Sequence, residues 1–184
     1  LTLRLSCLNQ LERTCILMID EIYVARRLEY FGGQMIGLTS GGELASTILC
    51  FMIKSLCHKY KDMVAIYPMN KLTALQLYEC YNEVITMLQK LNVNVVGISV
   101  DNAAVNRKFY VHHLCKGNLK SHIIDQRFNQ PIFLLFDSVH NVKNIYNNFL
   151  TRKTFDLPEY KSIYINISQC TASFKHIEEL YYLE

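Results

Sequence analysis

NVVGISVDNAAVNRKFY, residues Asn94–Tyr110, is the most informative stretch of this sequence. Its first part, from Val95 to Val100, is an almost continuous apolar run, which is typical of a β-strand covered on both faces. Asp101 follows at once, and the residues after it suit a helix. We therefore expect a strand that ends on a carboxylate and turns directly into a helix. Asp101 is then either the N-cap of that helix or a site residue, because ligands of open α/β sheets collect at the carboxyl ends of strands.

Two other apolar runs end on an acid in the same way. CILMID ends at Asp20, and IFLLFDSVH contains Asp137 and ends at His140. If the three strands lie side by side and parallel, then Asp20, Asp101 and Asp137 meet at one edge of one sheet. Carboxylates held that close repel each other unless a cation lies among them. The sequence therefore predicts a divalent metal site.

With these residues in place, the chain resembles the RNase H-like catalytic domain of P-element-type transposases. Domesticated relatives with an N-terminal zinc-dependent THAP-type DNA-binding domain belong to the same group. The matching blocks, in the family's order and spacing, are ILMIDEIYV (Ile16–Val24), FMIKSLCHKYKDMVAIY (Phe51–Tyr67), ISVDNAAVNRKFY (Ile98–Tyr110) and LFDSVHNVKNIYNNFL (Leu135–Leu150). The resemblance implies an α/β fold with a mixed sheet, in which an antiparallel meander is joined by two parallel strands and flanked by helices.

The resemblance also implies a chemistry, namely DNA transposition by metal-dependent strand cleavage and strand transfer. Asp20 matches the family's first catalytic Asp and Asp101 its second, and both would bind Mg²⁺ or Mn²⁺. Asp137 and His140 match a motif that we interpret as supporting the site. Glu21 is expected to point away from Asp20, because neighbouring residues of a strand face opposite sides.

Two parts of such a domain are expected in this chain. Residues 1–155 correspond to the N-terminal part of the RNase H-like catalytic domain, and residues 156–184, with SFKHIEELYYLE, to the start of a GTP-binding insertion. The family's third catalytic carboxylate, a Glu, lies beyond that insertion. We therefore expect the 184 residues to be a fragment that ends before this carboxylate and does not cut DNA alone. GTP binding and a homo-oligomer are expectations for a longer protein.

Basic residues follow each of the three acids. They are Arg26 and Arg27, Arg107 and Lys108, and Lys143. They are candidates for phosphate contacts, because a DNA backbone must be neutralised where it approaches carboxylates. Any one of these basic residues could equally well belong to a solvated helix face. The net charge of +3 does not by itself indicate a nucleic-acid partner. DNA as a partner, and the nucleus as the location, are implied by the resemblance.

The composition, with 51% hydrophobic and 19% charged residues, is ordinary for a globular α/β protein. We expect no membrane span, since charged residues interrupt every apolar run. The seven cysteines contain no CxxC pair, which fits reduced thiols better than a disulfide framework. Cys57-His58 together with His112-His113 and Cys115 could supply zinc ligands, but no second pair lies at the spacing of a zinc finger.

Hydrophobic periodicity predicts the remaining elements. Strands are expected at Thr14–Tyr23, Gln34–Thr39, Met63–Tyr67 and Pro131–Phe136, and helices at Glu43–Tyr60, Leu72–Leu91 and Val142–Leu150, with a polar segment at Gly117–Gln130. The helix at Glu43–Tyr60 is an addition to the simplest RNase H-like fold. It leaves a doubly wound α/β protein as the alternative fold.

Two other functions stay open at this point. One is a domesticated, non-catalytic descendant of a transposase that acts as a DNA-bound interaction protein, and the presence of both Asp20 and Asp101 counts against it. The other is a nucleotide-binding α/β enzyme unrelated to transposases. This second function lacks support because no glycine-rich phosphate loop follows a strand: neither Gly32-Gly33 nor Gly41-Gly42 precedes a Lys-Ser/Thr pair.

Overall fold

The computed structural model describes residues 5–125, 129–152, 154–157, 159–161, 166–167 and 170–183. The chain divides into two compact units, Leu1–Asp137 and Ser138–Glu184. The first unit holds the central sheet and the helices that cover it. The second unit begins with α4. The assignment of residues 156–184 to the start of a GTP-binding insertion stays a prediction.

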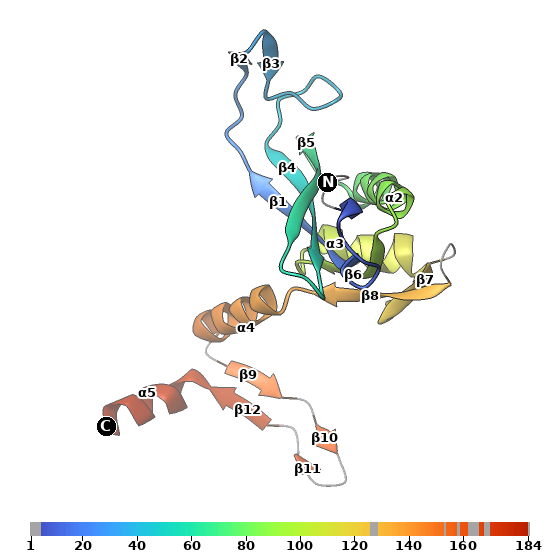
Figure 1. The fold of residues 1–184 in the computed structure, drawn as a ribbon. Coiled ribbons are helices and arrows are strands. Elements are labelled where there is room, and N and C mark those ends of the chain that lie inside the picture. Colours follow the sequence, from blue (N-terminus) through green and yellow to red (C-terminus); the bar gives the residue numbers. More distant parts are fainter. Residues whose placement is uncertain are drawn as a thin grey trace. The chain divides into compact units, whose positions relative to one another are not determined.

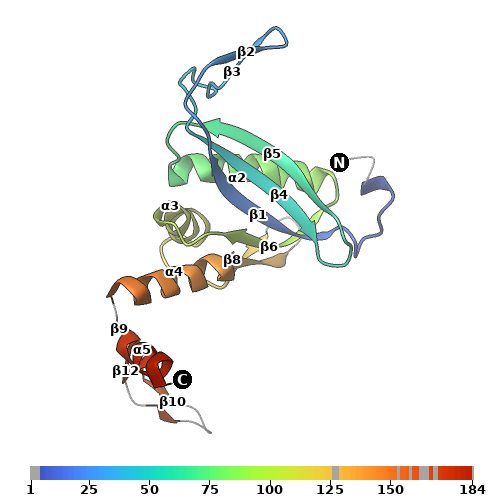
Figure 2. The same ribbon diagram turned by 90° about the vertical axis from the view of Figure 1, so that its left-hand side faces the viewer.

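A six-stranded mixed sheet forms the centre of the first unit (Figures 1 and 2). Its strands, in the order in which they lie side by side, are β5 (Lys61–Met69), β4 (Thr47–Ser55), β1 (Thr14–Tyr23), β6 (Asn94–Val100), β8 (Gln130–Phe136) and β7 (His122–Asp125). β4 is antiparallel to both β1 and β5, whereas β6 is parallel to both β1 and β8. The predicted RNase H-like arrangement, a meander joined by two parallel strands, is thus confirmed.

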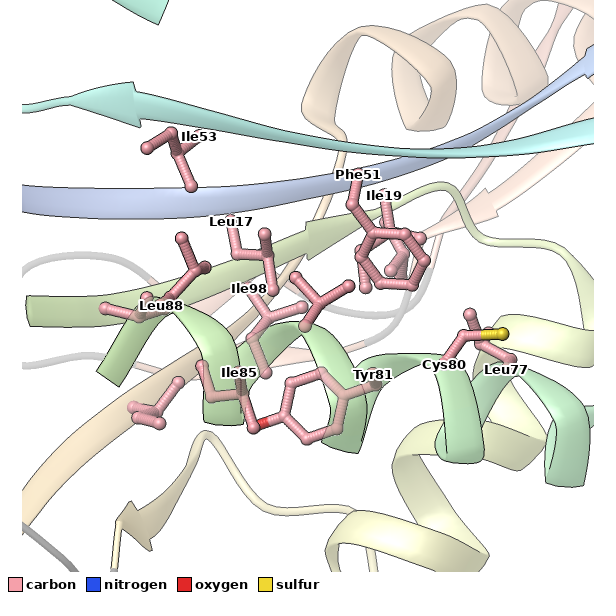
Figure 3. Packing of buried hydrophobic residues seen from close by; sticks show 14 of the residues in the cluster. Leu17, Ile19, Phe51, Ile53, Leu77, Cys80, Tyr81, Ile85, Leu88 and Ile98 are labelled. Carbon is pink, nitrogen blue, oxygen red and sulfur yellow. The ribbon is translucent and has the colours of Figure 1, made fainter. Parts of the chain in front are cut away.

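Helix α2 (Ala74–Lys90) packs against one face of this sheet and forms the core with it (Figure 3). The helix begins at a capping box, in which the Thr73 hydroxyl accepts the Gln76 N–H and the Gln76 side chain accepts the Thr73 N–H. Side chains alternate along β1, so Leu17 and Ile19 are buried on the α2 side while Met18 is 40% exposed on the other. Asp20 shares the face of Met18 by the same alternation.

Helix α3 (Ala104–Lys108) continues into a π-helical segment, η1 (Phe109–Leu114). Both Phe109 and Tyr110 are fully buried. The Tyr110 hydroxyl donates to the carbonyl oxygen of Ile98 at 2.9 Å and lies 3.1 Å from that of Leu135. The segment after Asp101 is therefore fastened to both β6 and β8.

Removal of that hydroxyl should weaken the fold. We expect Tyr110→Phe to lower the free energy of unfolding by about 1.5 kcal/mol, because buried carbonyl oxygens lose a hydrogen-bond donor. Urea denaturation measures the effect. Tyr30→Phe is the control, since Tyr30 is 73% exposed, and equal effects of the two substitutions would contradict the role assigned to the Tyr110 hydroxyl.

The helix predicted at Glu43–Tyr60 is wrong, because this stretch contains β4. Leu49, Phe51 and Ile53 are each at most 1% exposed and alternate along the strand. A strand that carries apolar residues on both faces also satisfies helical spacing, so periodicity alone did not distinguish the two structures. Backbone pairing with β1 on one side and β5 on the other stabilises the strand instead of a helix. The doubly wound alternative, which depended on this helix, is wrong as well.

The strand predicted at Gln34–Thr39 is shorter and lies outside the central sheet. β3 (Gln34–Ile36) pairs with β2 (Glu29–Phe31) in a separate hairpin. Gly32 and Gly33 connect them with φ of 57° and 83°, as a two-residue type I′ turn requires. The third predicted strand is longer than expected, because β5 runs through Pro68; a proline is tolerated there since β5 is an edge strand. β7, in the segment expected to be polar loop, was missed.

The second unit begins with α4 (Ser138–Arg152), which contains the predicted helix Val142–Leu150. The other described elements of this unit are β9 (Thr154–Leu157), β10 (Tyr160–Lys161), β11 (Asn166–Ile167), β12 (Cys170–Ser173) and α5 (Phe174–Leu183). β9 pairs with β12 and β10 with β11, both antiparallel. The rings of Phe149 and Phe174 lie 5.6 Å apart, so α4 and α5 contact each other within the unit.

Candidate metal centre

The register of the three parallel strands aligns the three predicted acids. Ser99 of β6 pairs with Met18 of β1 on one side and with Leu135 of β8 on the other. Two residues further along the chain from each of these lie Asp20, within β1, and Asp101 and Asp137, which directly follow β6 and β8. Neighbouring strands are about 4.8 Å apart, so this register places the acids in one row at the carboxyl edge of the parallel strands.

The side chain of Asp101 turns toward the start of α3. Its Oδ1 accepts two hydrogen bonds, from the Ala103 N–H at 2.8 Å and from Asn106 Nδ2 at 2.6 Å. The N-cap of α3 is Ala103, so the interpretation of Asp101 as the N-cap is wrong. Asp101 instead forms a turn with the backbone two residues on. The role of Asn106 at this site was not predicted from the sequence. Its position in the first turn of the predicted helix, close after Asp101, could have indicated it.

Asp20 and Asp101 line the same small hollow, of about 90 Å³. Asp20 Oδ1 accepts the N–H of Glu21 at 2.8 Å. Within the described part of the chain, the second oxygen, Oδ2, of neither aspartate takes part in a hydrogen bond or an ion pair. Each carboxylate thus keeps one oxygen for a ligand.

Glu21 lies on the other face of β1 from Asp20, as the alternation predicts, yet it also lines the hollow. Burial is the main cause that raises the pKa of Glu21, and the negative charges of Asp101 and then Asp20 add to it. The Thr47 hydroxyl nearby opposes this shift, although it is buried and has no hydrogen bond of good geometry among the described residues. Negative charge is therefore concentrated at this edge, and Glu21 was not expected to contribute to it.

The residues at this edge suit a divalent cation by chemistry, since carboxylate oxygens are the donors that Mg²⁺ prefers. The number of ligands is smaller than the sequence suggested. Among the residues that the structure describes, no three His, Cys, Asp or Glu side chains gather closely enough to hold a metal ion. Asp137 donates its backbone N–H to the Val100 carbonyl at 2.8 Å, but it does not line the hollow. Asp20 and Asp101 remain the two candidate ligands.

The predicted DNA-binding residues of the first unit are all exposed. Arg26 donates to Asn70 Oδ1, and Arg27 forms an ion pair of 2.6 Å with Glu29. Arg107 Nη1 lies 3.5 Å from Asn102 Oδ1, and Lys108 ends α3. The Arg27 charge is thus partly neutralised within the protein. Arg26, Arg107 and Lys108 are the better candidates for phosphate contacts.

His140 and Lys143 belong to the second unit. Both are exposed side chains of α4, His140 in its first turn. Their roles beside the acids of the first unit stay predictions.

A larger hollow, of about 600 Å³, lies between α2, η1 and β7, and none of the predicted catalytic residues lines it. His113 and Cys115, which were weighed as zinc ligands, do line it. The His113 ring stacks on Tyr78, with ring centroids 5.1 Å apart and planes at 22°. Among the described residues, His113 does not belong to any group of three side chains that could bind zinc. The described helices include none that is long and apolar enough to cross a membrane.

Residues 1–113 match the model of the family described as TNP-like, RNase H N-terminal domain, which is more than half of the chain. The chain belongs to this family. The predicted resemblance to P-element-type transposases is confirmed, and an unrelated nucleotide-binding enzyme is not favoured. No curated protein matches the chain.

The fold of this TNP-like RNase H domain is similar to a solved structure, the Drosophila P element transposase strand transfer complex. The TM-score is 0.73 at 18% sequence identity, and the match covers 100% of this chain and 38% of that chain. At this identity the likeness is one of fold. The chain thus spans about two fifths of the length of that transposase chain.

Proposed function

We propose that this chain is part of a transposase catalytic domain that cleaves DNA strands and transfers them to new DNA by metal-dependent phosphoryl transfer. The observation that supports it most is the row of acids, because the register of β1 and β6 places Asp20 and Asp101 at the same edge. Both line one hollow, and among the described residues the Oδ2 atom of each has no hydrogen-bond partner. The strand transfer complex of the neighbouring transposase supports the same reaction class.

In this proposal Asp20 and Asp101 hold Mg²⁺ or Mn²⁺ through their Oδ2 atoms. Bound there, the ion would activate the attacking water or 3′-hydroxyl and stabilise the leaving oxygen. Arg26, Arg107 and Lys108 contact the phosphates that flank the scissile bond, since each follows an acid in the sequence and is exposed. The DNA partner, the nucleus, GTP binding and a homo-oligomer belong to the proposal for the whole protein.

A nicking and strand-transfer assay on duplex DNA, with Mg²⁺ or Mn²⁺, tests the proposed function in a longer protein that contains these residues. Cleavage that requires the metal ion supports it, and an absence of both cleavage and DNA binding contradicts it. The 184 residues alone should bind the ion but give no turnover, since the described residues offer two carboxylate ligands. Robust nicking by the 184 residues, abolished by Asp101→Asn, would make Asp137 the leading candidate for a third ligand.

A further inference from the structure

Asn106 is a buried polar side chain, only 8% exposed, in α3, and the η1 segment that follows buries the apolar rings of Phe109 and Tyr110. Its Nδ2 atom lies 2.6 Å from Asp101 Oδ1. Burial of an amide costs free energy that its hydrogen bonds must offset, whereas an apolar side chain of similar size would pack without that cost. Packing alone therefore does not account for an asparagine here, but the bond to Asp101 does.

We propose that Asn106 is a positioning residue for Asp101 and leaves only Oδ2 of that carboxylate for a divalent cation. The inference rests on the function proposed above. Oδ1 already accepts two bonds, from Asn106 and from the Ala103 N–H at 2.8 Å. Both donors come from the first residues of the segment after β6, which Tyr110 fastens to the sheet. The carboxylate is thus held in one orientation by groups that cannot easily move.

This arrangement also bears on which cation the site selects. Mg²⁺ requires near-octahedral geometry at about 2.0 to 2.1 Å, whereas Ca²⁺ takes more oxygen ligands at about 2.3 to 2.6 Å and often binds both oxygens of one carboxylate. To present both oxygens, Asp101 would have to give up its bonds to Ala103 and Asn106. Asn106 therefore favours Mg²⁺ or Mn²⁺ over Ca²⁺.

Mn²⁺ binding to the 184-residue chain, followed by electron paramagnetic resonance, tests the inference without any assay of activity. Asn106→Leu keeps the size of the side chain and removes the donor. We expect it to weaken Mn²⁺ binding about tenfold or more, as the loss of an outer-shell partner commonly does. Competition with Mg²⁺ and Ca²⁺ should show a smaller preference for Mg²⁺ in Asn106→Leu than in the unchanged chain, which a merely structural role would not produce.

Gln89→Leu is the matched control. Gln89 Nε2 donates to Asp125 Oδ2 at 2.7 Å, so this substitution removes another amide-to-carboxylate hydrogen bond in the same unit. Gln89 lines the larger hollow and not the one with Asp20 and Asp101. We expect Gln89→Leu to leave Mn²⁺ affinity and cation preference unchanged. If Gln89→Leu lost as much Mn²⁺ affinity as Asn106→Leu, general destabilisation would explain both losses. That result would overturn the inference.

Asp101→Asn separates this inference from the proposed metal site. If Asp101→Asn loses Mn²⁺ while Asn106→Leu binds all three cations like the unchanged chain, the positioning role is refuted and the metal site stands. If Asp101→Asn binds Mn²⁺ normally, or the unchanged chain shows no saturable binding, both are refuted.

The unchanged chain provides a second test in case Asn106→Leu does not fold. Nuclear magnetic resonance follows the side-chain amide of Asn106 and the backbone amide of Ala103 during a titration with Mg²⁺. Both signals should shift with the same saturation, because both groups are bonded to the carboxylate that binds the ion. The signal of the Gln89 side chain should stay in place. An Asn106 signal that does not respond while Mg²⁺ binds would refute the positioning role.

Discussion

Asp101→Asn is expected to lower metal-dependent strand cleavage about a thousandfold in a longer protein that contains this chain and cleaves DNA. The substitution keeps the shape of the side chain, and the amide oxygen can still accept the bonds that Oδ1 takes from Ala103 and Asn106. It replaces Oδ2 by an NH₂ group, which cannot bind a cation. A metal ion contributes several kcal/mol to the stabilisation of the transition state, and about 4 kcal/mol corresponds to a thousandfold change in rate.

Initial rates of nicking on a labelled duplex measure this effect. Glu79→Gln is the control, because Glu79 is an exposed carboxylate of α2 that lies outside the hollow, and its removal should leave the rate unchanged. Asp20→Asn should resemble Asp101→Asn, since both residues lie in the same row. A cleavage rate of Asp101→Asn within a few-fold of the unchanged protein would show that this carboxylate is not a metal ligand.

The two strands that carry the candidate ligands could be predicted because their signals are local. An apolar run that ends in Asp20 or Asp101 needs no knowledge of its partners. The predicted strand Thr14–Tyr23 agrees with β1, and the apolar run Val95–Val100 agrees with β6 to within one residue. Their parallel pairing followed from the resemblance to a family. The row that includes Asp137 was therefore expected before the register was known, and the register then placed it.

The rest of the site depends on distances that the sequence does not contain. The bond from Asn106 to Asp101 joins residues five positions apart through a turn whose geometry sequence patterns do not specify. Glu21 was placed correctly on the opposite face from Asp20. The influence of Asp101 on the pKa of Glu21 depends on the pairing of β1 with β6, which brings the two carboxylates close together. Alternation predicts faces, but not which side chains meet at the end of a sheet.

The strand at Thr47–Ser55, which replaced a predicted helix, can be tested by the stability of core variants. We expect Phe51→Ala to lower the free energy of unfolding by about 4 kcal/mol, because it opens a cavity in the core. Phe51 is fully buried, its ring meets that of Tyr67 edge to face at 5.8 Å, and Figure 3 shows it beside Ile19. Ile53→Ala should cost about 3 kcal/mol for the same reason.

Met52→Ala, between these two positions, is the matched control. Met52 lies on the opposite face of the sheet, is partly exposed and pairs with Met18, so its truncation should cost only about 1 kcal/mol, the size of a typical single substitution. Denaturant unfolding of the three variants gives the comparison. In a helix, positions 51 and 53 would lie about 200° apart and could not both face the core. Large losses in the free energy of unfolding at both positions, with a small loss at Met52, therefore require the alternation of a strand. A small loss at either Phe51 or Ile53 would contradict the position of β4 in the centre of the meander.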